Sequence, residues 1–273
     1  MKLFAFDLDY TFLDDDKCIS RENIEALEEA QSRGINAVVS TGRFFTGIPE
    51  ELRKRCRYFI TINGSKVFDS KTGHIIYEST IPTQKALDVY AYADEIDCVY
   101  DAYIGDTGYM TQSMREKLED YVPDKKYAVT MLKQRAGVDN LKDFIRDNRL
   151  CPQKIQYFFK DLSLRETQLA ALPVRFPDLK FSMALGSNIE INSYGADKGI
   201  ALEALCSYLG IDISESVAFG DGLNDIAMLK AAGISYCMSN GDDRVKALAD
   251  RITEYDCNNS GVGRELQKLF KNE

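Results

Sequence analysis

Short apolar runs and amphipathic segments alternate over both ends of the chain. The first apolar run, 3–6, stops at Asp7, and residues 21–33 then repeat apolar side chains at helical spacing up to Gly34. A short apolar run is typical of a strand buried on both faces, and a helical repeat between two such runs is typical of a strand–helix–strand unit. The pattern predicts a parallel sheet covered by helices. Its expected strands are 3–6, 35–40, 58–62, 217–219 and 234–237.

The middle of the chain is richer in tyrosine and mixes strand and helix patterns. We expect strands at 98–104, 155–159, 179–183 and 189–192, and a helix at 162–172. This segment has enough apolar positions to form a smaller α/β domain of its own, which we place at 82–187. The expected fold class is therefore α/β, with a parallel-sheet core built from residues 1–81 and 188–273 and the smaller domain inserted into it.

The helix after the inserted segment has clear start and stop signals. Asp197 is a typical N-cap and Gly210 a typical C-terminal stop, so a helix is expected to begin at Lys198. We expect this helix to bury Ile200, Leu202 and Leu205, and a later helix to bury Val245 and Leu248.

Composition limits the classes of function. With 273 residues, of which 45% are hydrophobic, the chain can bury a sizeable core. Its net charge of -9 argues against a general binder of nucleic acid or of anionic membranes, since both need a basic face. No apolar run approaches the ~20 residues of a membrane span, and Asp7 comes too early for a secretory signal. We therefore expect a cytoplasmic protein with no nucleic-acid or membrane partner.

Cysteine and histidine usage narrows the chemistry further. The seven cysteines are scattered and form no Cys-x-x-Cys pair, which favours reduced core thiols over a disulfide framework or a zinc site. His74 is the only histidine and lies in a turn-like segment. The sequence therefore argues against a mechanism that needs a histidine base.

Polar residues follow the ends of the predicted parallel strands. In open α/β sheets ligands bind beyond the carboxyl ends of the strands, so these residues should meet at one rim. Converging carboxylates repel one another unless a cation shares the site, and an all-oxygen ligand set suits Mg²⁺. A lysine, a hydroxyl and backbone N–H groups suit a phosphate. The candidates are Asp7, Asp9, Thr41, Gly42, Asn63, Lys198, Asp221 and Asp225.

These groups can perform phosphoryl transfer together. A carboxylate can attack phosphorus and form an aspartyl-phosphate, but two unit charges ~4 Å apart repel by ~4 kcal/mol at an effective dielectric of ~20. Mg²⁺ and Lys198 would cancel this repulsion. A second aspartate could protonate the leaving oxygen and later activate water, provided that neighbouring carboxylates raise its pKa well above the reference value of ~3.9.

Each candidate also has an ordinary structural explanation. Asp221-Gly222 is a common turn, Asn224 or Asp225 a common N-cap, and Lys198 alone would usually be a solvated charge. The appearance of four such signals, each at a strand end or at the following helix start, favours the functional interpretation. Asn63 stays open between a site residue and a hairpin turn.

Four ordered motifs resemble those of the haloacid dehalogenase-like phosphatases, and most closely the Cof-type branch. The motifs are Asp7-Leu8-Asp9-Tyr10-Thr11, Thr41-Gly42-Arg43, Lys198, and Gly220-Asp221-Gly222-Leu223-Asn224-Asp225. The resemblance implies a Rossmann-like core and a cap inserted between the second and third motifs, in which the cap sets substrate specificity. It departs from the family's usual pattern at Tyr10, where these proteins carry glycine, and at Phe12, where they carry leucine.

By this resemblance each motif residue has an implied role. Asp7 is the nucleophile and Asp9 the general acid/base. The phosphate is held by Thr41 and Lys198 with the backbone at Leu8 and Gly42 and the Asn224 side chain. Mg²⁺ is held by the Asp7 carboxylate, the Asp9 backbone carbonyl and Asp221, while Asp225 supports either the ion or Lys198. The implied protein is a Mg²⁺-dependent phosphatase acting on a small phosphorylated metabolite, such as a sugar phosphate or a phosphorylated cofactor.

Three alternatives compete with this interpretation. A phosphosugar mutase could use the same scaffold, and product analysis would distinguish it. A receiver-like phospho-accepting module should carry its acceptor aspartate after the third strand, where this chain has Asn63. A calcium-binding loop starting at Asp7 should have glycine at its sixth position and glutamate at its twelfth, where Phe12 and Cys18 stand.

Overall fold

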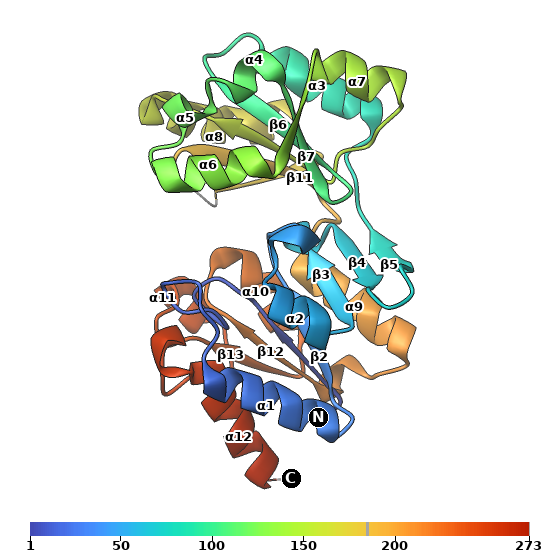
Figure 1. Ribbon diagram of the computed structural model, residues 1–273, viewed down its shortest axis with the longest axis vertical. Helices are drawn as coiled ribbons and strands as arrows, with labels where there is room; N and C mark the ends of the chain where they lie inside the picture. The colour runs from blue at the N-terminus through green and yellow to red at the C-terminus, as the bar shows by residue number, and fades with distance from the viewer. Residues whose placement is uncertain (184–185, 273) are drawn as a thin grey trace. The chain divides into compact units, whose positions relative to one another are not determined.

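The computed structural model describes residues 1–183 and 186–272, and the chain divides into two compact units (Figure 1). The first unit consists of Met1–Glu78 with Ala196–Glu273, and the second of Ser79–Gly195. The boundaries we predicted, 82 and 187, both fall inside the second unit. The second boundary lies later than predicted because the strand β11 (Asn188–Ser193) pairs with the sheet of the second unit.

The first unit is built on an eight-stranded sheet in the order β14-β13-β12-β1-β2-β3-β4-β5. The six strands from β14 to β3 are parallel, and β4 and β5 continue the sheet as antiparallel strands. The bounds are β1 Leu3–Phe6, β2 Asn36–Ser40, β3 Tyr58–Thr61, β4 Lys66–Asp69, β5 Ile75–Glu78, β12 Ser216–Gly220, β13 Ile234–Cys237 and β14 Arg251–Ile252.

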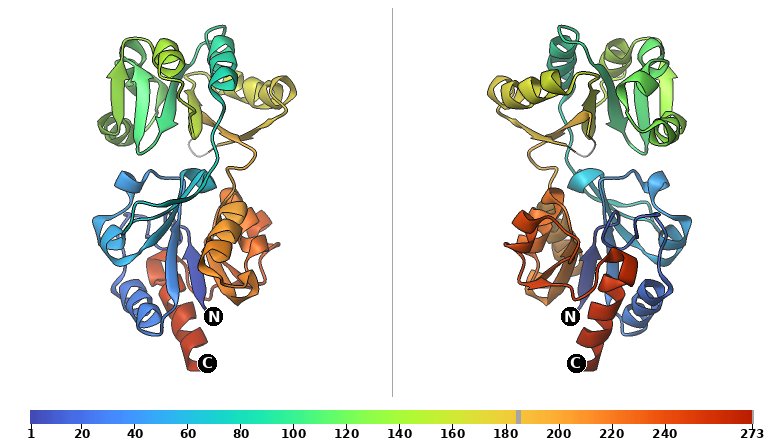
Figure 2. Two further views of the ribbon diagram at one scale, coloured as in Figure 1. Left: turned by 90° about the vertical axis from the view of Figure 1, so that its right-hand side faces the viewer. Right: turned by 90° about the vertical axis from the view of Figure 1, so that its left-hand side faces the viewer.

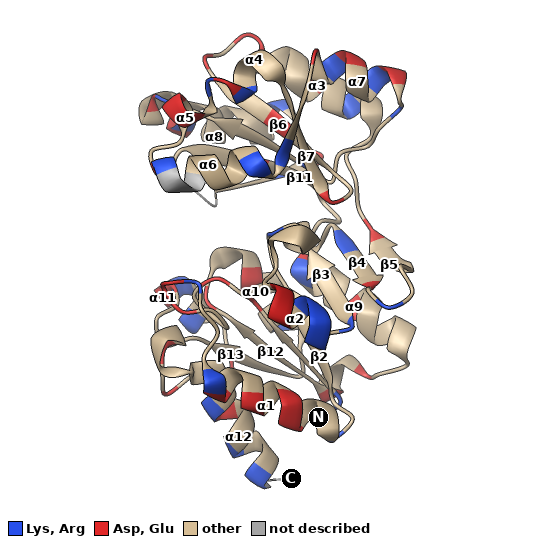
Figure 3. Ribbon diagram, viewed as in Figure 1, with Lys and Arg blue, Asp and Glu red and all other residues tan. Residues whose placement is uncertain are grey.

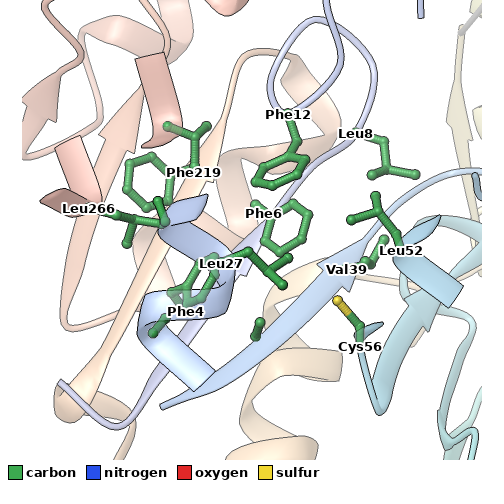
Figure 4. Close-up of a cluster of buried hydrophobic side chains, with 14 of the residues drawn as sticks. Phe4, Phe6, Leu8, Phe12, Leu27, Val39, Leu52, Cys56, Phe219 and Leu266 are labelled. Atoms are coloured by element: carbon green, nitrogen blue, oxygen red, sulfur yellow. The ribbon is translucent and has the colours of Figure 1, made fainter. Parts of the chain in front are cut away.

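Helices cover both faces of this sheet (Figure 2). On one face, α1, α2 and α12 pack against side chains such as Phe4 and Phe6 of β1, as the close-up of this core shows (Figure 4). On the other face, α9, α10 and α11 pack against Leu3 and Ala5. The bounds are α1 Arg21–Ser32, α2 Glu50–Arg55, α9 Lys198–Leu209, α10 Ile226–Ala231, α11 Asp243–Lys246 and α12 Gly261–Asn272.

The central strand β1 is fully buried on both faces, as its unbroken apolar run predicted. Helix α1 begins after Ser20, whose side chain accepts a hydrogen bond from the Asn23 N–H. Both α1 and α2 carry charged residues along their length (Figure 3). The expected α/β fold with a parallel-sheet core is confirmed.

The inward faces of two helices differ from our predictions. Ile200 is 40% exposed, and α9 instead buries Ala201, Leu202 and Leu205. Residues two apart on a helix point about 200° away from each other, so Ile200 and Leu202 could not both face the core. Leu248 is 46% exposed because α11 ends before it, at Lys246.

The second unit is a six-stranded sheet in the order β10-β11-β9-β6-β7-β8 with helices on both faces. Helices α3, α7 and α8 cover one face, and α5 and α6 pack against the other. The bounds are α3 Thr83–Ala93, β6 Val99–Ile104, β7 Thr107–Thr111, α4 Gln112–Arg115, α5 Leu118–Tyr121, α6 Lys125–Lys133, β8 Arg135–Val138, α7 Leu141–Asp147, β9 Lys154–Phe158, α8 Leu162–Arg175, β10 Leu179–Ser182 and β11 Asn188–Ser193.

In the described part of the chain, no helix is both long and apolar enough to cross a membrane.

Candidate active site

The carboxyl ends of β1, β12 and β2 bring most of the predicted site residues to one rim of the first unit's sheet. Asp7 follows β1, Asp221 follows β12 and Thr41 follows β2, and these strands lie side by side in the order β12-β1-β2. Lys198 is the first residue of α9, whose N-cap Asp197 accepts hydrogen bonds from the N–H groups of Gly199 and Ile200. The strand order and this N-cap therefore bring Asp7, Asp221 and Lys198 to the same rim of the sheet.

Lys198 connects two of the aspartates. Its Nζ lies 2.6 Å from Asp7 Oδ1 and 2.6 Å from Asp225 Oδ1, and the lysine is only 1% exposed. A buried ammonium is costly unless it is paired, so this lysine belongs to the site and is not a solvated surface charge.

Three carboxylates form an acidic cluster, which we define as Asp7, Asp221 and Asp225. One oxygen from each lies within 4.8 Å of the others. Both oxygens of Asp225 already accept protein hydrogen bonds, Oδ1 from Lys198 and Oδ2 from the N–H groups of Asp221 and Gly222. Asp7 and Asp221 are therefore better placed to offer oxygens to a cation, and Asp225 to hold the cluster together.

The acidic cluster carries more negative charge than Lys198 can balance. Burial raises the pKa of the Asp7 carboxyl well above its ordinary value, with the charge of Lys198 opposing and the charges of Asp225 and Asp221 adding to the rise. Burial and the charge of Asp225 raise the pKa of Asp221 to about 7. Burial would lower the pKa of Lys198, but the charges of Asp225 and Asp7 outweigh it and the pKa is raised. A buried, all-oxygen cluster with uncompensated negative charge fits a divalent cation such as Mg²⁺.

Thr11 is a site residue to which the sequence interpretation assigned no role. Its fully buried hydroxyl donates to Asp221 Oδ1 over 2.7 Å, so it fixes the orientation of that carboxylate. The loop after β1 turns back here because the Leu8 carbonyl accepts from the N–H groups of Thr11, Phe12 and Leu13. The sequence signal was a polar residue inside an otherwise apolar stretch.

Asp9 lies in a different environment from the one we predicted. It is not a member of the acidic cluster, and its two oxygens accept from Arg43, Nε to Oδ2 at 2.8 Å and Nη2 to Oδ1 at 2.6 Å. Lys17 Nζ lies 3.1 Å from Asp9 Oδ1. Burial would raise the pKa of Asp9, but the hydrogen bonds and charges of Arg43 and Lys17 outweigh it and lower the pKa. The expectation that neighbouring carboxylates raise this pKa is wrong, because two cations stand closer.

Thr41, Gly42, Asn63 and Asn224 come together on the other side of the rim. The Thr41 hydroxyl accepts from the Arg43 N–H at 3.2 Å, and the Thr41 carbonyl accepts from the Asn63 N–H at 3.1 Å. Asn224 Nδ2 donates to Asn63 Oδ1 over 3.3 Å. A Cβ on Gly42 would lie 2.7 Å from Asn63 Oδ1, so a larger residue here would displace the Asn63 side chain. Asn63 is therefore a neighbour of the motif residues and not merely part of a turn.

The backbone after β3 is strained where it meets the start of α9. Ile62, Asn63 and Gly64 have φ values of 53, 56 and 90°, a left-handed run that is unusual for a β-branched residue. A Cβ on Gly64 would lie 2.4 Å from the carbonyl carbon and oxygen of Asp197. This close approach ties the β3 turn to the helix start that carries Lys198.

Comparisons with known proteins show the family of this chain. A model of the haloacid dehalogenase-like hydrolase family matches residues 4–266. Phosphatase YwpJ of Bacillus subtilis is 32% identical over 271 residues, which cover 93% of this chain and 94% of that protein. The 5-amino-6-(5-phospho-D-ribitylamino)uracil phosphatase YcsE of the same organism is 32% identical over 256 residues, covering 93% of this chain and 90% of that protein.

A solved structure supports the same assignment. A haloacid dehalogenase-like hydrolase from B. subtilis has a TM-score of 0.82 and 29% identity, covering 98% of this chain and 100% of that chain. The resemblance that we drew from the four motifs and the expected enzyme class, a phosphoric monoester hydrolase, are confirmed. The chain belongs to the haloacid dehalogenase-like hydrolase family.

Proposed function

We propose that this protein is a Mg²⁺-dependent phosphatase that hydrolyses a small phosphorylated metabolite through an aspartyl-phosphate on Asp7. The observation that carries the proposal is the buried contact of Lys198 Nζ with both Asp7 and Asp225, beside Asp221. The Lys198 ammonium and the Asp7 carboxylate lie together at the carboxyl end of the central strand, where an incoming phosphate would need a cation and a nucleophile.

Asp7 is the proposed nucleophile. One of its carboxylate oxygens forms a bond to phosphorus while the bond from phosphorus to the ester oxygen breaks. Repulsion between the carboxylate and the phosphate oxygens opposes this approach. Each pair of unit charges ~4 Å apart repels by about 4 kcal/mol at an effective dielectric of ~20, so the total is several kcal/mol. Lys198 offsets part of this repulsion because its ammonium lies against Asp7 Oδ1.

Asp9 is the proposed proton carrier. It gives a proton to the departing ester oxygen, and it later takes a proton from the water that attacks phosphorus and releases phosphate from Asp7. Arg43 and Lys17 favour the carboxylate form of Asp9. The negative charge of an arriving phosphate would raise the pKa of Asp9 toward the value that the first step needs, with Arg43 and Lys17 still in place.

Asp7 and Asp221, together with the backbone carbonyl of Asp9, would hold Mg²⁺, and Asp225 would support the site through Lys198 and the Asp221 N–H. When bound, the ion would neutralise the clustered carboxylates and polarise the phosphoryl oxygens. The phosphate would be held by Thr41, Lys198 and Asn224 with the N–H groups of Leu8 and Gly42, and Asn63 would orient Asn224.

The substrate is proposed at the level of its class. A relative that is 32% identical is named for a phosphorylated ribitylaminouracil, which fits a small phosphorylated metabolite as the substrate here. We further propose that the second unit selects among such metabolites. Action in the cytoplasm also stays a prediction.

The proposal is tested by measuring phosphate release from p-nitrophenyl phosphate and from a panel of phosphorylated metabolites, with Mg²⁺ and with EDTA. The expected result is release that depends on Mg²⁺, with the dephosphorylated product accumulating. An isomeric phosphate in place of free phosphate would indicate a mutase. Absence of turnover on every substrate with Mg²⁺ present would contradict the proposal.

A further inference from the structure

Tyr10 and Lys17, which the proposed mechanism does not use as reacting groups, contact each other beside Asp9. Lys17 Nζ lies 3.6 Å from the centroid of the Tyr10 ring and 3.1 Å from Asp9 Oδ1. An ammonium over an aromatic face is attracted by the ring's negative charge density, so Tyr10 and Asp9 together hold Lys17 in one place.

Both Tyr10 and Lys17 have a left-handed backbone conformation. Tyr10 has φ 62° and Lys17 has φ 63°, a conformation that side chains other than glycine rarely adopt. Tyr10 is held there through its carbonyl, which accepts from Asn240 Nδ2 over 2.8 Å, and Lys17 through its N–H, which donates to the Asp14 carbonyl over 3.0 Å. Such residues persist where the surroundings fix them, and they gather at functional sites.

Arg43 completes the set of donors around Asp9. It binds both carboxylate oxygens, and its Nη1 donates to the Gly47 carbonyl over 2.9 Å, which anchors the guanidinium to the first unit. Arg43 and Lys17 together hold the Asp9 side chain on their own side, away from the acidic cluster. Without Lys17, Oδ1 would lose one of its two cationic partners, and the carboxylate would be freer to leave this position.

We infer that Lys17 is a positioning residue for the Asp9 carboxylate and that the Tyr10 ring positions Lys17. This inference rests on the proposed function, because it assumes that Asp9 delivers the proton to the leaving oxygen. A proton donor must be held within hydrogen-bond reach of its acceptor, so a loosened Asp9 slows the cleavage of esters whose leaving group needs that proton.

The test compares two leaving groups. p-Nitrophenolate leaves as a stabilised anion, whereas an alkoxide such as that of glycerol 3-phosphate needs a proton. The measured quantity is kcat/KM, because it covers the steps up to departure of the leaving group and excludes the later attack of water, which both substrates share. We expect Lys17→Gln to lower kcat/KM for the alkyl phosphate about tenfold more than for p-nitrophenyl phosphate.

Matched variants separate the ring, the charge and the backbone. Lys17→Arg should recover most of the alkyl phosphate activity, since it restores a cation at this place. Tyr10→Phe keeps the ring and should keep the wild-type ratio of the two kcat/KM values. Tyr10→Gly relieves the left-handed backbone but removes the ring, so it should change the ratio as Lys17→Gln does. Lys54→Gln, at an exposed lysine of α2, controls for loss of a surface charge.

Two results would overturn the inference. One is a Lys17→Gln variant that leaves the ratio unchanged, whether both activities fall together or neither falls. The other is a Tyr10→Gly variant with the wild-type ratio. Failure of the proposed function looks different, since the wild-type protein would then turn over neither ester with Mg²⁺ present.

Discussion

The chemistry of each aspartate depends on the nearest cation. Asp7 and Asp225 share the ammonium of Lys198, and Asp221 has a hydroxyl in place of a cation. Asp9 is held by a guanidinium and an ammonium outside that cluster. One residue type therefore occupies two electrostatic environments, one short of positive charge and one well supplied with it. The first suits a metal ion and a nucleophile, and the second an aspartate whose carboxylate is held apart from the acidic cluster.

Replacing the proposed nucleophile should abolish turnover and leave the fold intact. Asp7→Asn removes the attacking oxygen but keeps the shape of the side chain, so we expect kcat for p-nitrophenyl phosphate to fall by at least about 10³-fold. Asp16→Asn, at an exposed aspartate of the same loop, is the matched control and should retain wild-type turnover. A purified Asp7→Asn variant with a tenth of wild-type activity would contradict the assignment.

Thr11 gives a test of the metal site that does not remove a ligand. Thr11→Val keeps the shape but loses the hydroxyl that binds Asp221, so the Mg²⁺ concentration for half-maximal activity should rise about 10-fold or more. Thr11→Ser retains a hydroxyl and should need much less additional Mg²⁺. The measurement is a Mg²⁺ titration of phosphatase activity for the three proteins. An unchanged half-maximal concentration in Thr11→Val would show that Thr11 does not orient a metal ligand.

The identities of the site residues could be predicted from the sequence more fully than their electrostatics. Asp7, Asp221 and Lys198 follow strand ends or begin a helix, and both signals are local. The lowered pKa of Asp9 depends on Arg43 and Lys17, whose side-chain directions follow from tertiary contacts that spacing does not specify. The motif Thr41-Gly42-Arg43 contained the relevant arginine, but nothing local showed that it would bind Asp9.

Among the secondary-structure elements, the turn after β3 and the start of α9 depend on each other. Gly64 allows the turn to approach the Asp197 backbone, and the helix that begins there places Lys198 against Asp7 and Asp225. A change in the turn should therefore be transmitted to the site through the helix start.

Gly64→Ala tests this coupling between elements. The added Cβ would meet the Asp197 backbone at 2.4 Å, and φ is 90°, so we expect the free energy of unfolding to fall by about 1–3 kcal/mol and kcat to fall as well. Gly73→Ala has φ 73° but nothing within 4 Å of the new Cβ, so it isolates the cost of the backbone conformation. Urea unfolding measures both variants. Equal losses of stability would show that the close approach is unimportant.

Asp69, a buried aspartate in β4, should make the free energy of unfolding depend on pH in the acidic range. The hydrogen bond from Arg57 lowers the pKa of Asp69 to about 2 against the opposing effect of burial, from an ordinary value of 3.8. A lowered pKa adds stability that is complete above about pH 4 and is lost as the pH falls toward 2. Asp69→Asn should therefore be less stable than wild type at pH 6, with a difference that shrinks between pH 4 and 2. Urea unfolding at several pH values checks this, and a constant difference would contradict it.

Strands and helices with strong local patterns were predicted well, whereas helices of a single turn were not. β1 has the predicted bounds, and α9 begins at Lys198 and stops before Gly210 as expected. We predicted no helix or strand from α4 to α5. Each of these helices has four residues, which is too short for a helical repeat to be visible in the sequence. Their positions are set by packing on the sheet, as for Leu118 and Tyr121 against Val99 and Phe158.

For the whole molecule, the division into two units separates the hydrophobic cores. The buried clusters of the second unit contain only residues between Ile81 and Ile191. Those of the first unit combine residues from both ends of the chain, since β1 pairs with β2 on one side and with β12 on the other. A unit with its own core can fold alone, whereas the first unit needs both of its segments.

A fragment of residues 79–195 tests this division. We expect it to unfold cooperatively in urea when followed by circular dichroism, because its sheet and both of its hydrophobic clusters are complete. A fragment of residues 1–78 is the contrasting control and should show no cooperative transition, since β1 lacks β12. A non-cooperative 79–195 fragment would contradict the independence of the second core.

The pairing of β1 with β12 also has a consequence for biosynthesis. During translation the ribosome releases the residues of β1 early, but it makes those of β12 only after the whole inserted segment. The nascent inserted segment can fold on its own before β12, the strand that pairs with β1, has been synthesised. Lys198 and Asp221 are also synthesised late. A chain still attached to the ribosome would therefore be inactive until synthesis is nearly complete.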